Sequence, residues 1–549
     1  MNAIVYKNII WFFALVLFCV FLAFLSQVNN QFIGVNVRSN LLFFLLIVLL
    51  SLDKTSLKNV FFKWGFVLIT FYLFLYSFVL DGLTVLMGYS SVSFEFNVQW
   101  ETLIDLFGST NLRETKEYFS DHFFNITMVV LMWIFTSLVA IVGGTIFIRK
   151  SPFLMKTMPM YIALLLWMAL YLFHGLAKET HLLPNLALGK IYYEQAKKQR
   201  NEYREGSRKS YELTQPKTVE NMTVILVIGE STTRLNMGVY DYARNTTPFL
   251  SKNKKEFVIF EHAISTAFYT IPSLTRALTY SYQKDEKWYL SPNIVEVAKK
   301  YGYKTYWLSN QAMLGKHDTP IGFIGYQADK VVGINLSGLS GGRFDGDLLP
   351  IVKDAINDTS SKKLIIVHTM GTHGSYKKRY PPKFQQYLES DIVSENLKNK
   401  GVSDEIINSR ADYDSAINYV DFFIASILGV VKDKMGKTPK NVYLVYFSDH
   451  GQDVGHFSKT SFGHSHSEAG YKIPLILWPK ERLEKEFKAI NENKKKLVGS
   501  DSINLVIGAL LGVESKNDFK NNPLRLEYDR DEIELQNNKI ISLKNMKDK

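Results

Sequence analysis

Five long apolar segments, all in the first third of the chain, constrain this fold more than any other feature of the sequence. A helix needs about 20 apolar residues to cross a hydrocarbon core roughly 30 Å thick. Apart from Arg38, whose side chain can extend to the interface, the segments contain no Lys, Arg, Asp or Glu. We therefore predict five transmembrane helices within residues 1–180. They cover residues 9–27, 32–52, 64–80, 123–148 and 157–177.

Loop charges predict the orientation of these helices. Lys7, the loop with Lys54, Lys58 and Lys63, and the loop 149–156 are basic, whereas the loop 81–122 is mainly acidic. Basic loops stay on the cytoplasmic side. Five spans with the N-terminus inside then place the rest of the chain outside, which in a bacterium is the periplasm. We expect a multi-pass protein of the inner membrane with a soluble periplasmic domain over residues 219–549.

The charge of the second part suits a membrane surface. Residues 1–177 contain 10 of the 64 Lys and Arg and 8 of the 52 Asp and Glu, which leaves 54 − 44 = +10 for residues 178–549. In a periplasmic domain this excess suits anionic lipid and excludes nucleic acid as the expected partner. Residues 181–218 bridge the two parts. Their Lys, Arg and Tyr fit either a helix on anionic lipid or a solvated linker.

Cysteine content excludes two classes of protein. The only cysteine, Cys19, lies inside an apolar segment. An intramolecular disulfide is therefore impossible, and a cysteine-ligated zinc site is excluded.

The soluble part is predicted to be an α/β domain with a mostly parallel sheet. Short β-branched and aromatic runs alternate with helical patterns at 293–301 and 413–431, as expected of strands buried on both faces. Ligands of such sheets bind at the carboxyl ends of the strands. The expected strands are 223–228, 305–308, 364–367, 442–447 and 473–478.

Metal-binding side chains follow two of these strands. Glu230 comes just after the first strand, and Asp449 and His450 follow the strand 442–447. Carboxylate and imidazole are ligands that zinc accepts, and three of them leave a fourth position open for catalysis. Four of the 11 histidines, at 450, 456, 464 and 466, lie close together in the sequence, which favours functional roles for at least two of them.

A hydroxyl group would have to act as the nucleophile. Ser265, Thr266 and Thr270 precede a predicted helix whose first turn contains Pro272. A hydroxyl there could be activated by a metal while the helix N-terminus holds a phosphate. The alternative is that these hydroxyls only cap the helix.

Several motifs in order resemble those of the phosphoethanolamine transferases of Gram-negative bacteria, which belong to the alkaline phosphatase and sulfatase superfamily. The resemblance covers nearly the whole chain. Its motifs are Val-Ile-Gly-Glu-Ser-Thr-Thr-Arg (227–234), Tyr-Asp-Tyr-Ala-Arg-Asn-Thr-Thr-Pro (240–248), Thr-Ile-Pro-Ser (270–273), Trp-Leu-Ser-Asn-Gln (307–311), His-Thr-Met-Gly-Thr-His-Gly-Ser-Tyr (368–376) and Phe-Ser-Asp-His-Gly (447–451).

The resemblance implies an alkaline-phosphatase-like fold and a zinc enzyme of lipid chemistry. Such an enzyme takes phosphoethanolamine from phosphatidylethanolamine, releases diacylglycerol, holds the group on a threonine and passes it to lipid A or another envelope acceptor. The family's metal-binding residues correspond to Glu230, Asp449 and His450.

The remaining roles also follow from the resemblance. The nucleophile, also a metal ligand, corresponds to Thr266, which keeps the Thr-Ala dipeptide of relatives but stands six residues before Pro272 instead of five. Thr270 therefore remains a rival. His373 and His464 correspond to active-site histidines, and the nearby His466 is an alternative to His464. Asn310, Gln311 and His466 are expected to contact substrate.

Other functions remain as alternatives. A phosphoglycerol transferase of the same superfamily would use phosphatidylglycerol and often manganese. A sulfatase is disfavoured, because its nucleophile is a Cys or Ser two residues before a proline and four before an arginine, a pattern absent from 270–274. A membrane-anchored binding module would need no metal, and a transporter is disfavoured by the lack of charge in the spans.

Overall fold

The computed structural model describes the C-terminal part of the chain. It covers residues 211–544 except 216–219, 282–287, 312–319, 336–342, 388–390, 437–440, 460–461 and 536–538. All of these residues belong to one compact unit. The predicted transmembrane helices and nearly all of the bridging segment lie outside the described residues.

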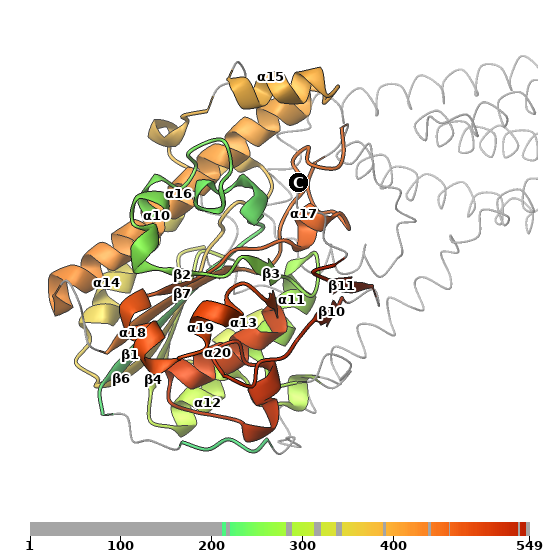
Figure 1. The fold of residues 1–549 in the computed structure, drawn as a ribbon. Helices are drawn as coiled ribbons and strands as arrows, with labels where there is room; N and C mark the ends of the chain where they lie inside the picture. Colours follow the sequence, from blue (N-terminus) through green and yellow to red (C-terminus); the bar gives the residue numbers. More distant parts are fainter. Residues whose placement is uncertain are drawn as a thin grey trace, which may run out of the picture. The chain divides into compact units, whose positions relative to one another are not determined.

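A seven-stranded sheet forms the centre of the described unit, in the order β2-β8-β7-β1-β6-β4-β5 (Figure 1). Strand β1 pairs in parallel with β6 and β7, and β4 pairs in parallel with β6 and β5. The pairs β7–β8 and β8–β2 at one edge are antiparallel, so β8 runs opposite to the other strands. The strands are β1 Met222–Gly229, β2 Val258–Ile259, β4 Lys304–Ser309, β5 Lys330–Gly333, β6 Lys362–His368, β7 Val442–Ser448 and β8 Leu475–Trp478.

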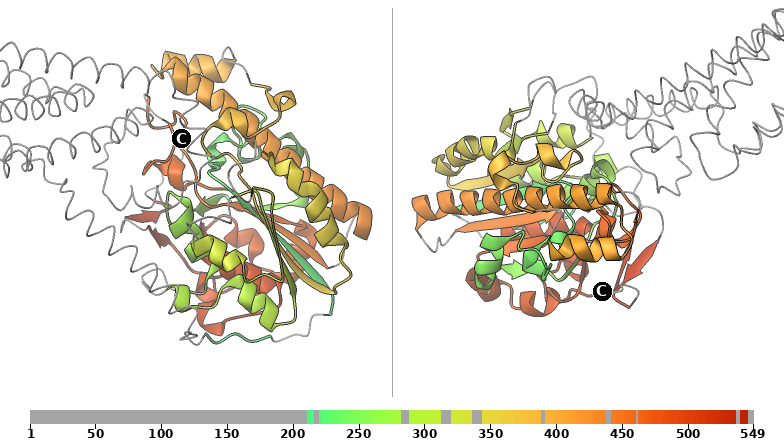
Figure 2. Two further views of the ribbon diagram at one scale, coloured as in Figure 1. Left: turned by 180° about the vertical axis from the view of Figure 1, so that it is seen from behind. Right: turned by 90° about the horizontal axis from the view of Figure 1, so that it is seen from above.

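Helices cover both faces of the sheet (Figure 2). On one face, side chains of β1, β6 and β7 pack against α11, α12, α13 and α20, and on the other against α10, α14 and α16. Every residue of β1 and β7 is buried, because a central strand has helices on both sides. The helices are α10 Pro248–Lys252, α11 Thr270–Leu278, α12 Ile294–Lys300, α13 Pro320–Gly325, α14 Leu349–Asn357, α15 Ile392–Asn399, α16 Asp404–Met435, α17 Glu468–Tyr471, α18 Lys480–Glu486, α19 Ile490–Asn493 and α20 Ile503–Leu510.

Two small sheets lie outside the main one. Strand β3 (His262–Ile264) pairs in parallel with β9 (Leu497–Gly499). Strands β10 (Glu532–Glu534) and β11 (Ile540–Ser542) form an antiparallel pair.

The long helix α16 is a core helix. Within the described part of the chain it alone is long and apolar enough to cross a membrane. Its apolar residues Ile417, Ile424, Ile427 and Leu428 are nevertheless fully buried in the core on one face of the sheet. Packing against the sheet therefore accounts for its composition.

The predicted α/β class and mostly parallel sheet are confirmed. Each expected strand is present within one or two residues of its predicted ends, and both expected helices form. Asn293 caps α12 by accepting from the backbone N–H groups of Val295 and Glu296. The helix expected at 413–431 extends further toward its N-terminus, where the Ser403 side chain caps it.

The strand register brings three loops together at the carboxyl ends of the central strands β1, β6 and β7. Gly229 at the end of β1 lies opposite Ser448 of β7, and Ile228 lies opposite His368 of β6. The residues that follow are therefore neighbours in space. Gly371, with φ of +49°, passes so close to Glu230 that a Cβ atom would come within 2.7 Å of its backbone.

Candidate metal centre and active site

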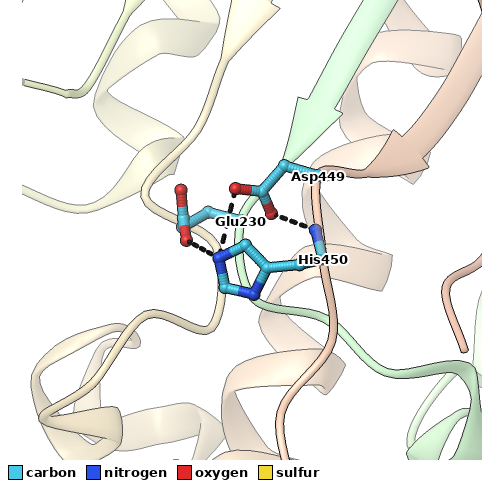
Figure 3. Close-up of side chains that lie close together, drawn as sticks. All are labelled: Glu230, Asp449 and His450. Atoms are coloured by element: carbon cyan, nitrogen blue, oxygen red, sulfur yellow. Dashed lines mark hydrogen bonds and ion pairs between the residues drawn. The ribbon is translucent and has the colours of Figure 1, made fainter. Parts of the chain in front are cut away.

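Glu230, Asp449 and His450 form a buried cluster at the carboxyl ends of β1 and β7. One potential ligand atom of each lies within 4.8 Å of the others. The Nε2 atom of His450 is 3.3 Å from Oε1 of Glu230 and 3.4 Å from Oδ2 of Asp449. Figure 3 shows the three side chains pointing toward one another. The expectation that these residues come together is confirmed.

The backbone orients Asp449 so that one oxygen faces the cluster. Its Oδ1 atom accepts hydrogen bonds from the backbone N–H groups of Ser231 (2.9 Å) and His450 (2.7 Å). Its Oδ2 atom is buried and accepts no hydrogen bond within the described part of the chain. A buried carboxylate oxygen without a donor is costly unless a cation binds it.

His450 has the tautomer of a metal ligand. Its Nδ1 atom lies 2.9 Å from the carbonyl oxygen of Gly451, which can only accept, so Nδ1 carries the proton. The lone pair of the neutral ring is then on Nε2, which faces the two carboxylates. Metal-bound histidines are oriented in this way by a hydrogen bond from the other ring nitrogen.

The charges of the cluster also fit a cation. Burial and the charge of Glu230 raise the pKa of Asp449 to about 8. Burial opposes a charged imidazole, yet Asp449 and Glu230 raise the pKa of His450 to about 9. Without a metal, the cluster therefore retains protons at neutral pH. A divalent cation could replace them, and two oxygens with one imidazole nitrogen form a ligand set suited to zinc.

Of the three candidate hydroxyls, that of Thr270 lies at the cluster. Its Oγ1 atom is 3.2 Å from Oε2 of Glu230 and 3.4 Å from Nε2 of His450. The hydroxyl of Thr266 instead lies 3.4 Å from that of Ser500, its hydrogen-bond partner among the described residues. The hydroxyl of Ser265 donates to backbone carbonyl groups.

Of the two threonines left open by the sequence, the structure thus places Thr270, and not Thr266, at the candidate metal ligands. Thr266 precedes α11 by four residues, at a point where the chain passes Ser500. Thr270 is the first residue of α11, and the N-cap residue Tyr269 makes no side-chain capping bond to this helix. In this first turn the N–H groups of Thr270 and Ile271 have no carbonyl partner within the helix, Pro272 has no N–H, and the N–H of Ser273 donates to Tyr269.

Two further histidines line the cluster. The ring of His464 lies 4.8 Å from that of His450 and 6.3 Å from that of His373. Burial, with the charges of His450 and His373, lowers the pKa of His464 to about 3. Nδ1 of His464 bonds the carbonyl oxygen of Phe268 at 3.1 Å, so its other ring nitrogen has the free lone pair. Both histidines expected in the site are thus near the ligands.

The two polar residues that follow β4, Asn310 and Gln311, bond to different carboxylates. Gln311 donates from Nε2 to Oε2 of Glu230 at 2.8 Å, so it holds a ligand in place. Asn310 donates to Asp345 at 2.8 Å. Asp345 in turn accepts from the backbone N–H groups of Met370 and Gly371 and so shapes the loop beside Glu230. No spacing in the sequence indicated this role of Asp345.

His466 lies against an aromatic cluster. Its ring centroid is 4.0 Å from that of Phe268, and its Nδ1 atom is 3.0 Å from the hydroxyl oxygen of Tyr471. Of the two alternatives, His464 is therefore the histidine whose ring lies beside a metal-ligand candidate.

The motif at 240–248 forms a support behind the site. Arg244 is buried and pairs with Asp414 at 2.8 Å and with Asp391 at 2.7 Å. The side chains of Thr246 and Thr247 accept from the backbone of Gly238 and Val239. The motif is thus held by a buried polar network with α15 and α16.

Comparison with protein families then identifies the domain. A family model described as sulfatase matches residues 222–512, which is more than half of the chain. The chain belongs to the sulfatase family. Membership specifies the fold of the domain, whereas its function has to be argued from the residues of the site.

Curated relatives of this sulfatase-family chain include named transferases. Phosphoethanolamine transferase EptC of Escherichia coli (strain K12) is 35% identical over 272 residues, which is 48% of this chain and 46% of the relative. Phosphoethanolamine transferase CptA of Salmonella typhimurium is 35% identical over 269 residues, 47% of this chain and 45% of the relative. The resemblance drawn from the motifs is confirmed. The chain spans just under half the length of these relatives.

Solved structures of such proteins share the fold. The C-terminal periplasmic domain of EptC from Escherichia coli, in complex with Zn, has a TM-score of 0.56 and 27% identity, covering 61% of this sulfatase-family chain and 96% of that domain. Integral membrane protein EptA of Neisseria meningitidis has a TM-score of 0.55 and 17% identity, covering 89% of this chain and 96% of its own. The alkaline-phosphatase-like fold is therefore confirmed.

Proposed function

We propose that this chain transfers phosphoethanolamine from phosphatidylethanolamine to lipid A or another envelope acceptor, with zinc as cofactor and Thr270 as the nucleophile. One observation carries the proposal: the Thr270 hydroxyl lies within 3.4 Å of two candidate metal ligands at the start of a helix. The relatives named phosphoethanolamine transferases support the choice of transferred group.

Glu230, Asp449 and His450 would hold the zinc ion. Their donor set, and the burial of Asp449 Oδ2 without a hydrogen-bond donor in the described structure, support this assignment. The related Escherichia coli domain has been solved with Zn. When bound, zinc supplies Lewis-acid chemistry, which lowers the pKa of a hydroxyl and stabilises negative charge on phosphate oxygens.

In the first half-reaction, Oγ1 of Thr270 attacks the phosphorus atom of phosphatidylethanolamine. The new Thr270–phosphate bond forms as the bond between phosphorus and the glycerol oxygen breaks. The proton lost by Thr270 is transferred to the departing diacylglycerol oxygen. The N–H groups of Thr270 and Ile271, in the first turn of α11, have no carbonyl partner within the helix and would stabilise the charge that accumulates on the phosphate.

In the second half-reaction, an acceptor oxygen attacks the phosphothreonine and Thr270 recovers its proton. His464 is placed to take the acceptor's proton, because its Nδ1 atom bonds the carbonyl oxygen of Phe268 and its other ring nitrogen keeps a lone pair beside His450. His373, whose ring lies 6.3 Å from that of His464, is placed to share this task or to bind the phosphate oxygens. The overall exchange conserves atoms and protons.

The membrane segments predicted from the sequence fit this chemistry. Donor and acceptor are both amphiphiles, so an enzyme anchored in the inner membrane with its catalytic domain in the periplasm meets both on one surface. Confinement to that surface replaces a search in three dimensions.

The proposal is tested with the full-length chain in detergent, phosphatidylethanolamine labelled in the ethanolamine group, and lipid A. We expect label on lipid A, release of diacylglycerol, and loss of both in Thr270→Ala. Phosphatidylglycerol supplied alone is the matched control. Transfer of phosphoglycerol from it, with none from phosphatidylethanolamine, would contradict the proposed donor.

A further inference from the structure

A hydrogen-bond chain behind Glu230 ends on the oxygen that faces His450. The hydroxyl of Ser231 donates to Oε1 of Glu230 at 2.7 Å. The side-chain amide of Gln452 donates from Nε2 to the same Ser231 hydroxyl at 3.1 Å. The hydroxyl of Tyr376 donates to Oε1 of Gln452. All four residues are nearly or fully buried, so water does not compete for these bonds.

The backbone of Ser231 is held in an unusual conformation. Its φ of +60° lies in the left-handed region, which residues other than glycine seldom occupy. The Tyr413 hydroxyl donates to the carbonyl oxygen of Ser231 at 2.7 Å and accepts from the N–H of Thr233 at 2.8 Å. The N–H of Ser231 donates to Asp449. Such strain persists where the surroundings impose it, commonly at functional sites.

The hydrogen bonds that lead from Tyr376 to Glu230 all donate in the same direction, toward Glu230. Burial raises the pKa of Tyr376 well above its ordinary value, so its hydroxyl keeps the proton that it donates to Gln452. The Gln452 amide accepts from Tyr376 through its oxygen and therefore presents its NH₂ group to Ser231. Because an NH₂ group only donates, the Ser231 hydroxyl directs its own proton to Glu230.

We propose that Gln452 is a positioning residue that sets Ser231 as a hydrogen-bond donor to Glu230 and thereby fixes the ligand carboxylate in its metal-binding orientation. The inference rests on the proposed metal-binding role of Glu230. Gln311 donates to the other carboxylate oxygen, Oε2, so a neutral donor besides the Thr270 hydroxyl holds each oxygen of Glu230. Partners of this kind orient metal ligands and tune their affinity.

The side chain at position 452 determines which acceptor receives the proton of the Ser231 hydroxyl. A glutamate there would be an acceptor, so it would attract the Ser231 proton away from Glu230. An apolar side chain would remove the donor but leave Ser231 free to bond Glu230. Gln452→Glu should therefore weaken metal binding more than Gln452→Leu.

The test measures zinc affinity of the full-length chain in detergent by competition with a chromophoric chelator. We expect Gln452→Glu and Ser231→Ala each to weaken zinc binding by about 10-fold to 100-fold, the usual effect of losing a partner of a ligand. The double variant should be no weaker than Ser231→Ala alone, because the donated bond is already absent. The visible spectrum of the Co²⁺-loaded chain should change in the same variants.

Gln385→Glu is the matched charge control, because Gln385 is exposed and remote in sequence from the ligands. It should leave zinc affinity unchanged. Additive losses in the double variant, or equal losses in Gln452→Glu and Gln452→Leu, would overturn the proposal. If Gln452→Glu fails to fold, Gln452→Leu decides it: removing the donor to Ser231 should cause a measurable loss of zinc affinity, smaller than that of Ser231→Ala, and wild-type affinity would overturn the proposal.

The outcome is separable from that of the proposed function. Zinc affinity and the Co²⁺ spectrum are measured without any lipid. Glu230→Gln shows whether Glu230 binds the metal at all. A chain that binds zinc as described but transfers no phosphoethanolamine would refute the transferase proposal and leave the role of Gln452 intact.

Discussion

The hydroxyl oxygen of Thr270 lies 3.2 Å from Oε2 of Glu230, although the two residues are 40 positions apart in the sequence. Glu230 follows the central strand β1, and Thr270 begins α11, which packs on one face of the sheet. The fold thus brings a hydroxyl at a helix start to the carboxylate at a strand end. This juxtaposition defines the candidate active site.

Asp449→Asn should abolish stoichiometric zinc binding. Oδ1 of Asp449 accepts two backbone hydrogen bonds, so an asparagine would keep its oxygen there and turn its NH₂ group toward the metal position. An NH₂ group only donates and cannot act as a ligand. Metal analysis of the purified chain should give about one zinc ion per wild-type chain and far less in Asp449→Asn.

Gln385→Glu again provides the control for metal analysis, since its side chain is exposed. Wild-type zinc content in Asp449→Asn, with Gln385→Glu also normal, would show that the metal binds elsewhere.

The strands and the cluster of candidate metal ligands could be predicted because their signals are local. Buried parallel strands appear as continuous apolar runs, and Glu230, Asp449 and His450 directly follow two of them. The rule that ligands gather at the carboxyl ends of strands then brings these residues together. The register of β1 against β7 confirms that step.

The nucleophile could not be chosen by the same reasoning. Thr266 and Thr270 both precede a helix, and the choice depends on where α11 begins relative to Glu230, which is a tertiary relationship. One signal did favour Thr270: it stands two residues before Pro272, as the nucleophile of sulfatases does. The Thr-Ala dipeptide favours Thr266 instead, and its spacing of six residues to Pro272 is what leaves Thr270 as a rival.

The supporting hydrogen bonds were also beyond sequence reasoning. Tyr413 clamps the loop after Glu230 from 182 residues away, and Asp345 holds the loop at Met370 and Gly371. Neither contact follows a spacing rule, because each depends on how a helix or loop packs over the sheet edge.

His464→Gln should slow the second half-reaction more than the first. The ring of His464 lies 4.8 Å from that of His450, and its Nδ1 atom bonds the carbonyl oxygen of Phe268, so its other ring nitrogen is placed to accept a proton from the acceptor hydroxyl. Loss of such a base typically costs about 10²-fold to 10⁴-fold in rate. Rapid-quench measurements should show the phosphothreonine accumulating in this variant.

His466→Gln is the comparison for that experiment. The ring of His466 packs on Phe268 and bonds Tyr471, so its replacement should leave the rates of both half-reactions within a few-fold of wild type. Equal losses of rate in His464→Gln and His466→Gln would contradict the assignment of the proton transfer to His464.

Asp421 should make stability decrease as pH rises. Burial raises its pKa to about 7, while its carboxylate accepts the backbone N–H groups of Phe249 and Leu250 at the start of α10. Between pH 4 and pH 7 the folded state therefore binds a proton that the unfolded state has lost, and the free energy of unfolding falls as pH increases.

Asp421→Asn removes this titration. From pH 5 to pH 7.5, the free energy of unfolding of wild type should fall relative to that of the variant by about 2–3 kcal/mol. Denaturant titrations of both proteins at the two pH values measure the difference. A difference that stays constant with pH would show that Asp421 is already ionised in the folded protein at pH 5.

The most direct test of the site is the intact mass of the full-length chain after exposure to phosphatidylethanolamine without an acceptor. Wild type and Thr266→Ala should both gain the mass of one phosphoethanolamine group, and fragmentation should place it on Thr270. Thr270→Ala should gain none. An adduct that persists in Thr270→Ala but is absent from Thr266→Ala would contradict the central claim and assign the nucleophile to Thr266.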